Sequence, residues 1–218
     1  MGQQIFDLIR RGQTAELATA LQDNPRLAQS CDTQGVSALM WAIYTHQRPV
    51  VELLRPHAGP LGIFEAAALG DCSRLSALLA ADAMAAHAVA GDGWSALHLA
   101  AAFGTPEAVL LLIEHGAHVH QFSHNPLRNQ PLHACLALDG SAATVKALID
   151  AGADVNAVGA GDYTPLHLAA ANNRVDVIGL LLQAGAQRDA RCAQGKTPED
   201  YARERGHEEV VRLLQPAA

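Results

Sequence analysis

Four histidines are crowded into one short stretch, HGAHVHQFSHNPLRN, which covers residues 115–129. Neutral imidazole nitrogens are common ligands of zinc and nickel, so two or three of these side chains could hold such an ion. The stretch contains no cysteine, and Glu114 is the nearest carboxylate. Two interpretations stay open, a metal site and a solvated hairpin whose imidazoles bind nothing. The four candidate ligands are His115, His118, His120 and His124.

A second group of histidines recurs at regular distances along the chain, and each of them directly follows a leucine. These residues are His98, His133 and His167. An imidazole serves as a general base only when a nucleophile or a second titratable group lies against it. Cys135 follows His133 by two residues, but the other two copies have alanine there. The chain holds no P-loop, no HExxH and no GxGxxG in a strand-turn-helix context. We therefore expect no catalytic residue.

The composition narrows the classes of partner. The chain has 218 residues, a formal net charge of −7, 50% apolar residues and only 4% aromatic residues. Nucleic-acid binding normally requires a basic patch, and none is visible. No apolar run is long enough to span a bilayer, and the four cysteines include no CxxC pair. These features predict a cytoplasmic protein with reduced thiols that binds neither nucleic acid nor a membrane.

The elements that carry these histidines repeat along the chain. GWSALHLAAAFG at 93–104 returns as DYTPLHLAAANN at 162–173, and weaker copies occur elsewhere. We use the leucine before the histidine as a register mark and follow it, or its replacement, through every copy. The marks are Ile5, Leu39, Ile63, Leu97, Leu132, Leu166 and Glu199, with steps of 34, 24, 34, 35, 34 and 33 residues.

A period near 33 with a TPLHxA core resembles the ankyrin-repeat family, as a stand-alone or bacterial-type member, over essentially the whole chain. The resemblance implies an all-α solenoid of about seven helix-turn-helix repeats with short β-hairpin loops, here called fingers. One repeat cannot bury its own apolar faces, so neighbours must stack. We expect a single domain over 1–218. Its approximate repeats are 2–31 as N-cap, 32–58, 59–89, 90–124, 125–158, 159–191 and 192–218 as C-cap.

One step in the series is about nine residues short. Only RPHAGPLG, residues 55–62, separates the helical segment VVELL from the mark Ile63. Its two prolines and two glycines indicate a tight connector. We expect one finger to be missing near 55–62 and the stacking angle to change there. A harmless deletion and a functional notch are both compatible with this pattern.

The resemblance also implies roles for the repeated residues. His98, His133 and His167 would hydrogen-bond the backbone of adjacent turns and tie each repeat to the next. Ser95 and Thr164 would cap the helices that follow them. This structural interpretation stands against the catalytic one considered above.

The family binds partners on a concave face built from the fingers and the first helix of each repeat. Position by position, the resemblance gives eleven candidate partner-binding residues, four of them aromatic in a chain with nine aromatics. Aromatic side chains are frequent hot spots of protein interfaces. Alternatively, they pack against neighbouring fingers and helices. The candidates are Gln34, Val36, Tyr44, Asp92, Trp94, Phe103, Leu127, Asn129, Leu138, Tyr163 and Asn172.

The sequence thus favours a non-catalytic protein–protein interaction module that needs no cofactor. Its partner is expected to be another protein, and the chain itself a monomer. The competing hypothesis is a metal-binding or enzymatic protein that uses the His-rich hairpin at 115–124. Self-association through the groove or the caps is a third possibility.

Overall fold

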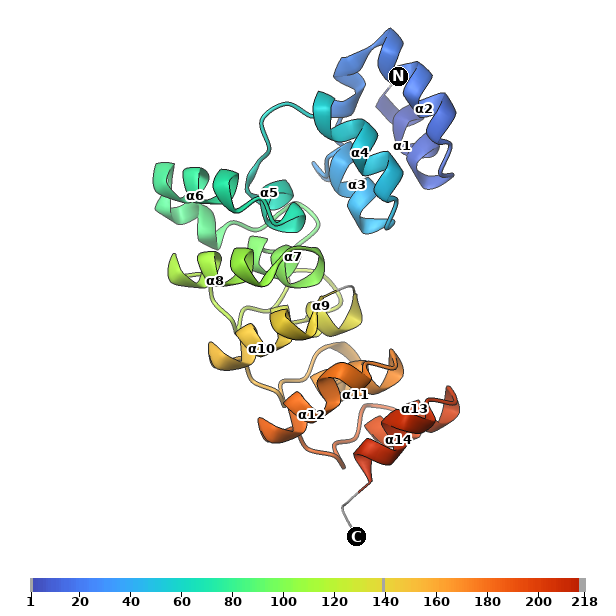
Figure 1. Ribbon diagram of the computed structural model, residues 1–218, viewed down its shortest axis with the longest axis vertical. Coiled ribbons are helices and arrows are strands. Elements are labelled where there is room, and N and C mark those ends of the chain that lie inside the picture. The colour runs from blue at the N-terminus through green and yellow to red at the C-terminus, as the bar shows by residue number, and fades with distance from the viewer. Residues whose placement is uncertain (1, 139, 216–218) are drawn as a thin grey trace.

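The computed structural model describes residues 2–138 and 140–215, which form fourteen α-helices in seven antiparallel pairs. The first helices of the pairs form an inner row and the second helices an outer row (Figure 1). The inner helices are α1 Gly2–Arg10, α3 Ala38–Tyr44, α5 Ile63–Leu69, α7 Ala96–Phe103, α9 Pro131–Ala137, α11 Pro165–Ala171 and α13 Pro198–Glu204. The outer helices are α2 Thr14–Asp23, α4 Arg48–Leu54, α6 Cys72–Ala81, α8 Pro106–Glu114, α10 Ala142–Asp150, α12 Val175–Gln183 and α14 Glu208–Leu214.

Short polar caps start several inner helices. The side-chain oxygens of Ser37, Ser95, Thr164 and Thr197 each accept the backbone N–H three residues on. Such a cap satisfies one of the donors that a helix leaves unpaired at its first turn. The cap residue therefore fixes where each inner helix begins.

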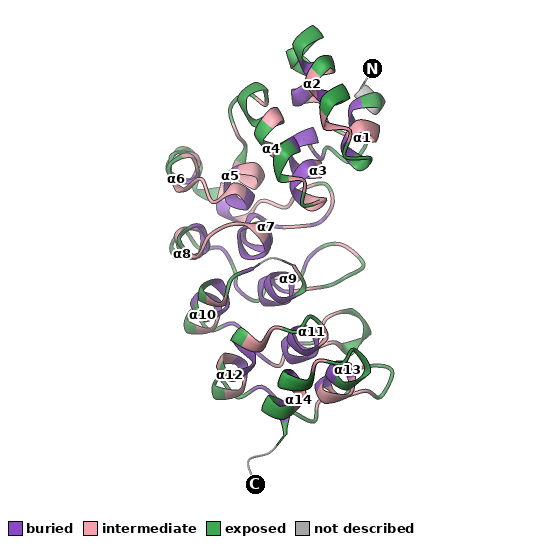
Figure 2. Ribbon diagram, turned by 45° about the vertical axis from the view of Figure 1, so that its right-hand side comes forward, coloured by how far each residue is buried: buried purple, intermediate pink, exposed green. Residues whose placement is uncertain are grey.

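Small residues allow the inner helices to approach one another closely. In α7 every residue from Ala96 to Ala102 is buried, and only Phe103 at its end is half-exposed. Figure 2 shows the same arrangement along the column, with buried inner helices and exposure concentrated on the outer ones. The inner row therefore forms the core, and one apolar layer is shared by successive repeats.

The fingers are narrow turns rather than extended hairpins. Four of them are closed by a backbone bond from residue i to i+4, at Asp32–Val36, Ala90–Trp94, Gly159–Tyr163 and Cys192–Lys196. The fifth closes from Ser123 to Asn129 and is two residues longer, as its period predicts. In the described residues, β-structure is limited to two isolated bridges, Cys31 with Ser37 and Val89 with Ser95.

Successive fingers are joined edge to edge by single backbone hydrogen bonds. The N–H of His124 donates to the carbonyl of Gly93 at 2.8 Å, and that of Ala193 to Gly161 at 2.9 Å. Between them, Ala160 donates to Leu127 at 3.0 Å. The finger row therefore continues from repeat to repeat on one side of the stack.

The missing finger is confirmed at the joint between α4 and α5. Leu54 ends α4 and Ile63 begins α5, and the connector between them contains only a 3₁₀ turn at Arg55–His57. The finger after α6 closes the gap, because a Cβ atom on Gly91 would overlap the carbonyl oxygen of Gln34. Glycine is therefore required where the finger at 90–94 meets the finger at 32–36.

The fingers at 32–36 and 90–94 meet across the missing finger, and a cleft lies between the helices of the two neighbouring repeats. The end of α3, one side of α4 from its first residue onward and the end of α5 border a cleft of about 510 Å³, with Arg48, Val51 and Leu69 among its walls. Helices α1–α4 consequently form a block that is displaced against the column of α5–α14 (Figure 1). The core divides in the same way, since Ala68 and Leu99 pack with the first block and most buried residues after α4 form a second cluster.

Candidate protein-binding groove

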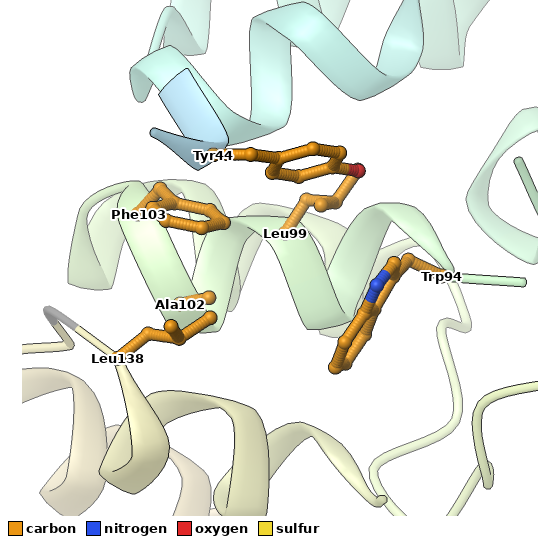
Figure 3. A pocket seen from close by; sticks show the side chains of 6 residues that line it. All are labelled: Tyr44, Trp94, Leu99, Ala102, Phe103 and Leu138. Atoms are coloured by element: carbon orange, nitrogen blue, oxygen red, sulfur yellow. The ribbon is translucent and has the colours of Figure 1, made fainter. Parts of the chain in front are cut away.

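An apolar pocket lies where the displaced block meets the column. Its volume is about 170 Å³, and side chains from three repeats surround it (Figure 3). Tyr44 comes from the end of α3, and Leu138 is the residue after α9. The remaining lining residues are Trp94, from the finger before α7, and Leu99, Ala102 and Phe103 of α7.

Helical periodicity explains why α7 provides the floor. Leu99, Ala102 and Phe103 are spaced i, i+3 and i+4, so their side chains lie on one face of the helix. Alanine in the middle of this set leaves a hollow between two larger side chains. Tyr44 and Trp94 extend the wall on either side, so the hollow becomes a pocket (Figure 3).

A carboxylate fixes the two aromatic walls. The Tyr44 hydroxyl donates to Asp92 Oδ2 at 2.6 Å, and the backbone N–H of Trp94 donates to Asp92 Oδ1 at 3.2 Å. Burial raises the pKa of Tyr44, and the hydrogen bond to Asp92 and the charges of Asp92, Glu65 and Asp32 raise it further. Tyr44 is therefore a neutral hydrogen-bond donor in a region of negative potential.

The pocket aromatics also hold the two blocks together. The rings of Tyr44 and Phe103 are 5.7 Å apart, and the His46 ring lies 5.8 Å from Phe103. Trp94 packs edge-on against the buried ring of His98 at 5.3 Å. The packing interpretation made from the sequence thus applies to Tyr44, Trp94 and Phe103, and each of them is half-buried and lines an open pocket.

The structure brings together five of the eleven candidate residues, with Tyr44, Trp94, Phe103 and Leu138 in the pocket wall and Asp92 at its edge. The others are spread along the fingers and inner helices. Leu127 is 50% exposed, and Gln34 and Asn172 are exposed as well. The scaffold uses part of this set, since Asn172 Nδ2 donates to the carbonyl of Leu136 and the Tyr163 hydroxyl pairs with that of Tyr201. Asn129 is half-buried, and its carbonyl accepts from His98.

The expectation of an exposed side chain at Val36 is wrong. Val36 is only 8% exposed and belongs to the core cluster of the first block. Removing a valine side chain from water is favourable by about 1.5–3 kcal/mol, so an apolar residue at this finger position turns inward. Its backbone N–H donates to Asp32 Oδ1, which holds the finger in that conformation.

Sequence reasoning missed Leu99 as a lining residue. It lies inside the Leu-His-Leu-Ala segment at 97–100, and the candidate set does not include it. It is indeed 1% exposed, but its side chain forms the floor between Tyr44 and Phe103 (Figure 3). The i, i+4 spacing back from Phe103 is a signal that could have identified it.

The three regularly spaced histidines join neighbouring repeats. The Nε2 atoms of His98 and His167 lie 2.8 Å from the carbonyl of Asn129 and 3.0 Å from that of Lys196. His133 Nε2 reaches the carbonyls of Ala157 and Tyr163 at 3.1 and 3.2 Å. A carbonyl only accepts, so Nε2 carries the proton and Nδ1 is left to accept at the helix cap.

Burial keeps these imidazoles neutral. It lowers the pKa of His98 to about 4, and it also lowers the pKa of His133 and of His167. The Ser95 hydroxyl lies 2.7 Å from His98 Nδ1, and the Thr164 hydroxyl 2.8 Å from His167 Nδ1. Both ring nitrogens of these two residues are thus engaged in the scaffold.

The four histidines at 115–124 are exposed and take part in different contacts. His115 Nδ1 lies 2.8 Å from the carbonyl of Leu111, and the His118 ring stacks on His87 at 5.1 Å. His120 contributes its carbonyl to Gln130, and the backbone N–H of His124 donates to Gly93. Within residues 2–138 and 140–215, no three His, Cys, Asp or Glu side chains come together as a metal site would require.

Comparison with known proteins assigns the family. A family model described as ankyrin repeats (3 copies) matches residues 63–159 and 137–218. The match begins at the first residue of α5, directly after the irregular joint. The chain belongs to the ankyrin-repeat family. Family membership supports a protein-interaction module rather than an enzyme.

Similar proteins include two kinase inhibitors. Cyclin-dependent kinase 4 inhibitor B of Bos taurus is 36% identical over 132 residues, which cover 59% of this chain and 95% of that protein. Cyclin-dependent kinase inhibitor 2A of Homo sapiens is 37% identical over 123 residues, covering 56% of this chain and 76% of that protein. Protein fem-1 homolog C of Homo sapiens is 42% identical over 69 residues, which cover 32% of this chain and 11% of that protein.

Among the described residues, no helix combines the length and the apolar character needed to cross a membrane.

Proposed function

We propose that this chain is a non-catalytic module that holds a partner protein in its concave groove, at the pocket between Tyr44, Trp94, Phe103 and Leu138. The observation that carries the proposal is the pocket itself, which is apolar, open and built from three repeats. Partly buried aromatic side chains around a hollow are the usual setting of interface hot spots.

The neighbouring finger extends this surface. Leu127 is 50% exposed at the tip of the finger that follows Trp94 in the row. A partner that enters the pocket would therefore also meet the finger tips, where Gln34 provides an exposed amide, and the exposed residue Asn172 directly after α11. An apolar centre with a polar rim is the anatomy of a transient protein interface.

A protein kinase is the first class of partner to test. Two relatives carry cyclin-dependent kinase inhibitor in their names, and the alignment covers 95% of one of them. Binding without chemistry fits a chain whose buried histidines are engaged in hydrogen bonds between repeats. A monomer that binds neither nucleic acid nor a membrane remains part of this proposal.

Photo-crosslinking tests the proposal face by face. A photoreactive phenylalanine analogue is placed at position 127 on the finger row, and a matched one at position 110. Leu110 is 44% exposed on the outer helix α8, so the two sites differ in face rather than in exposure. We expect a cross-linked protein from position 127 and none from position 110, with mass spectrometry identifying the adduct.

One outcome of this experiment would contradict the proposal. A partner that cross-links only from position 110 would place binding on the convex face and reject the groove. Purified protein kinases, added one at a time to the same two variants, test the partner class separately. If position 127 cross-links to a protein but to none of the kinases, groove binding would stand and a kinase would be rejected as the partner.

A further inference from the structure

The wall of the pocket and the charges around it define the segment that it can accept. We infer, on the basis of the proposed function, that the pocket takes one large apolar side chain (Leu, Met or Phe) from a basic segment of the partner. Lysine or arginine residues on either side of that anchor would lie along the acidic edge of the groove. The argument rests on size, on polarity and on charge.

The size of the pocket fits one side chain. Its volume is about 170 Å³, which is the space of a single large aliphatic or aromatic group. Leu99 and Ala102 close the floor, and Tyr44 and Phe103 stand on one side with Trp94 on the other (Figure 3). A second anchor would have no matching hollow within this site, so specificity should depend on one position of the partner.

The polarity of the wall selects an apolar group. Five of the six lining side chains carry no charge and no hydroxyl group. The sixth, Tyr44, already donates its hydroxyl proton to Asp92 at 2.6 Å. The indole N–H of Trp94 and the Tyr44 hydroxyl are the polar groups of this wall. A charged group entering the pocket would therefore lose hydration with little to replace it, and that loss is costly.

The charges at the edge favour a basic segment. The carboxylate of Asp92 lies at the pocket edge, and Glu65 and Asp32 add to the negative potential at Tyr44. From residue 63 to residue 127 the chain has six acidic residues and a single lysine or arginine, Arg74, besides six histidines. Arg74 Nε donates to the carbonyl of Leu61 at 2.7 Å, in the connector between the blocks.

Arg10 of the first block, which acts on Asp32, is also engaged, because it lies over the Trp41 ring at 4.8 Å. Hydrogen bonds from the Trp41 side chain and from backbone N–H groups lower the pKa of Asp32 against its burial, and the charge of Arg10 lowers it further. Like charges brought together at an interface repel each other, so an acidic segment of a partner would bind this edge unfavourably. The same carboxylates would attract lysine or arginine beside the anchor.

Synthetic peptides test this inference directly. The probes are an acetylated, amidated Gly-Lys-Arg-Phe-Arg-Lys-Gly peptide, its Leu and Met analogues, its Phe-to-Ala analogue and its Glu-flanked analogue. The readout is the NMR indole N–H signal of Trp94, which the variant Trp41→Phe assigns. We expect the apolar-anchored basic peptides to shift this signal, and the Ala and Glu analogues to bind at least about tenfold more weakly.

Charge and space are then removed separately. Asp92→Asn keeps an acceptor for Tyr44 but loses the charge, so we expect about threefold weaker binding of the basic peptides and a smaller salt dependence. Glu107→Gln on the outer helix α8 removes the same charge from an exposed site away from the pocket and should change neither. Ala102→Leu should abolish binding by filling the hollow, and Leu138→Trp is the second variant if the first unfolds.

The possible failures are distinguishable. Peptides that bind equally well with Glu flanks, or without the apolar anchor, would overturn the inferred chemistry. The absence of any shift at Trp94 would also overturn it, and cross-linking from position 127 would then show whether the groove still binds a protein. Only the loss of that cross-link would remove the proposed function as well.

Discussion

The joint between α8 and α9 and the joint between α4 and α5 connect similar repeats by different means. At the regular joint, His98 reaches the next repeat through Asn129, and the backbone of His124 joins the two fingers. At the irregular joint, Met40 stands at the register position of the histidine and the finger is absent. The comparison teaches that hydrogen bonds to backbone carbonyls, from the buried histidines and from the finger backbone, hold the column, whereas contacts between side chains hold the first block.

Those side chains are few, and two of them also form the candidate site. The Ser37 hydroxyl donates to Glu65 at 2.8 Å, Tyr44 donates to Asp92, and the Tyr44 ring packs on Phe103. The pocket exists because the shortened finger row brings the end of α3 over α7. The irregular joint is thus tied to the candidate site.

The largest effect is expected at the regular joint. His98→Ala would leave the Asn129 carbonyl without its donor and open a cavity in a fully buried position. We expect a loss of about 3 kcal/mol in the free energy of unfolding, measured by urea denaturation. His98→Gln retains an N–H donor and should lose clearly less; equal losses would mean that the hydrogen bond is unimportant.

A pH series sharpens the same comparison. The folded pKa of His98 is lowered to about 4 from 6.5, so the unfolded chain takes up the proton first as the pH falls. Stability is therefore present above pH 6.5 and declines toward pH 4, by about 2 kcal/mol at pH 5 for this residue alone. His133 and His167 add to it in the same direction.

The comparison with the first block gives this series its control. On lowering the pH from 7 to 5, hydrogen exchange should accelerate more in α7–α13, where the three histidines lie, than in α1–α3. In α1 and α3 the residues at the position of the repeated histidine are Phe6 and Met40. In His98→Gln the slope of stability against pH should flatten. An unchanged slope in that variant would contradict the assignment to His98.

Removing an aromatic from the irregular joint should have a smaller and more local effect. Phe103→Ala deletes a half-buried ring that packs on Tyr44 and His46. We expect a loss of about 1.5 kcal/mol that appears mainly as faster hydrogen exchange in α1–α4. Uniform acceleration through α14 would show instead that the two blocks open as one unit.

The smallest effect is expected from Tyr44→Phe, which removes only the hydroxyl bonded to Asp92. The loss should be about 1 kcal/mol by urea denaturation, because the ring contact with Phe103 remains. In the double variant with Asp92→Asn, the two losses should not add, since both variants remove parts of the same interaction. Additive losses would argue that the bond does not link the blocks.

Much of the fold could be predicted because the sequence of each repeat contains local signals for the start and end of its helices. Ser95 and Thr164 mark helix starts, and Gly116 and Gly152 follow helices at positive φ, as C-terminal glycines commonly do. The short step before Ile63 predicted the absent finger because the register marks are independent of that segment.

The pocket could be predicted only in part, because it depends on the angle between two blocks. Register placed Tyr44, Trp94 and Phe103 on one face, but not the contact between Gly91 and Gln34 that brings them together. Val36 failed for a different reason, because its side chain turns into the core of its own block, which an alignment to a regular repeat does not include. Angles of this kind come from long-range packing, which local patterns do not encode.

Hydrogen exchange of the chain, alone and with the protein captured from position 127, tests the central claim that the groove at the irregular joint is the binding site. The account predicts simultaneous protection of two segments from the two blocks, the end of α3 around Tyr44 and the segment from Asp92 to Phe103. Protection confined to the outer helices α8, α10 and α12 would contradict it.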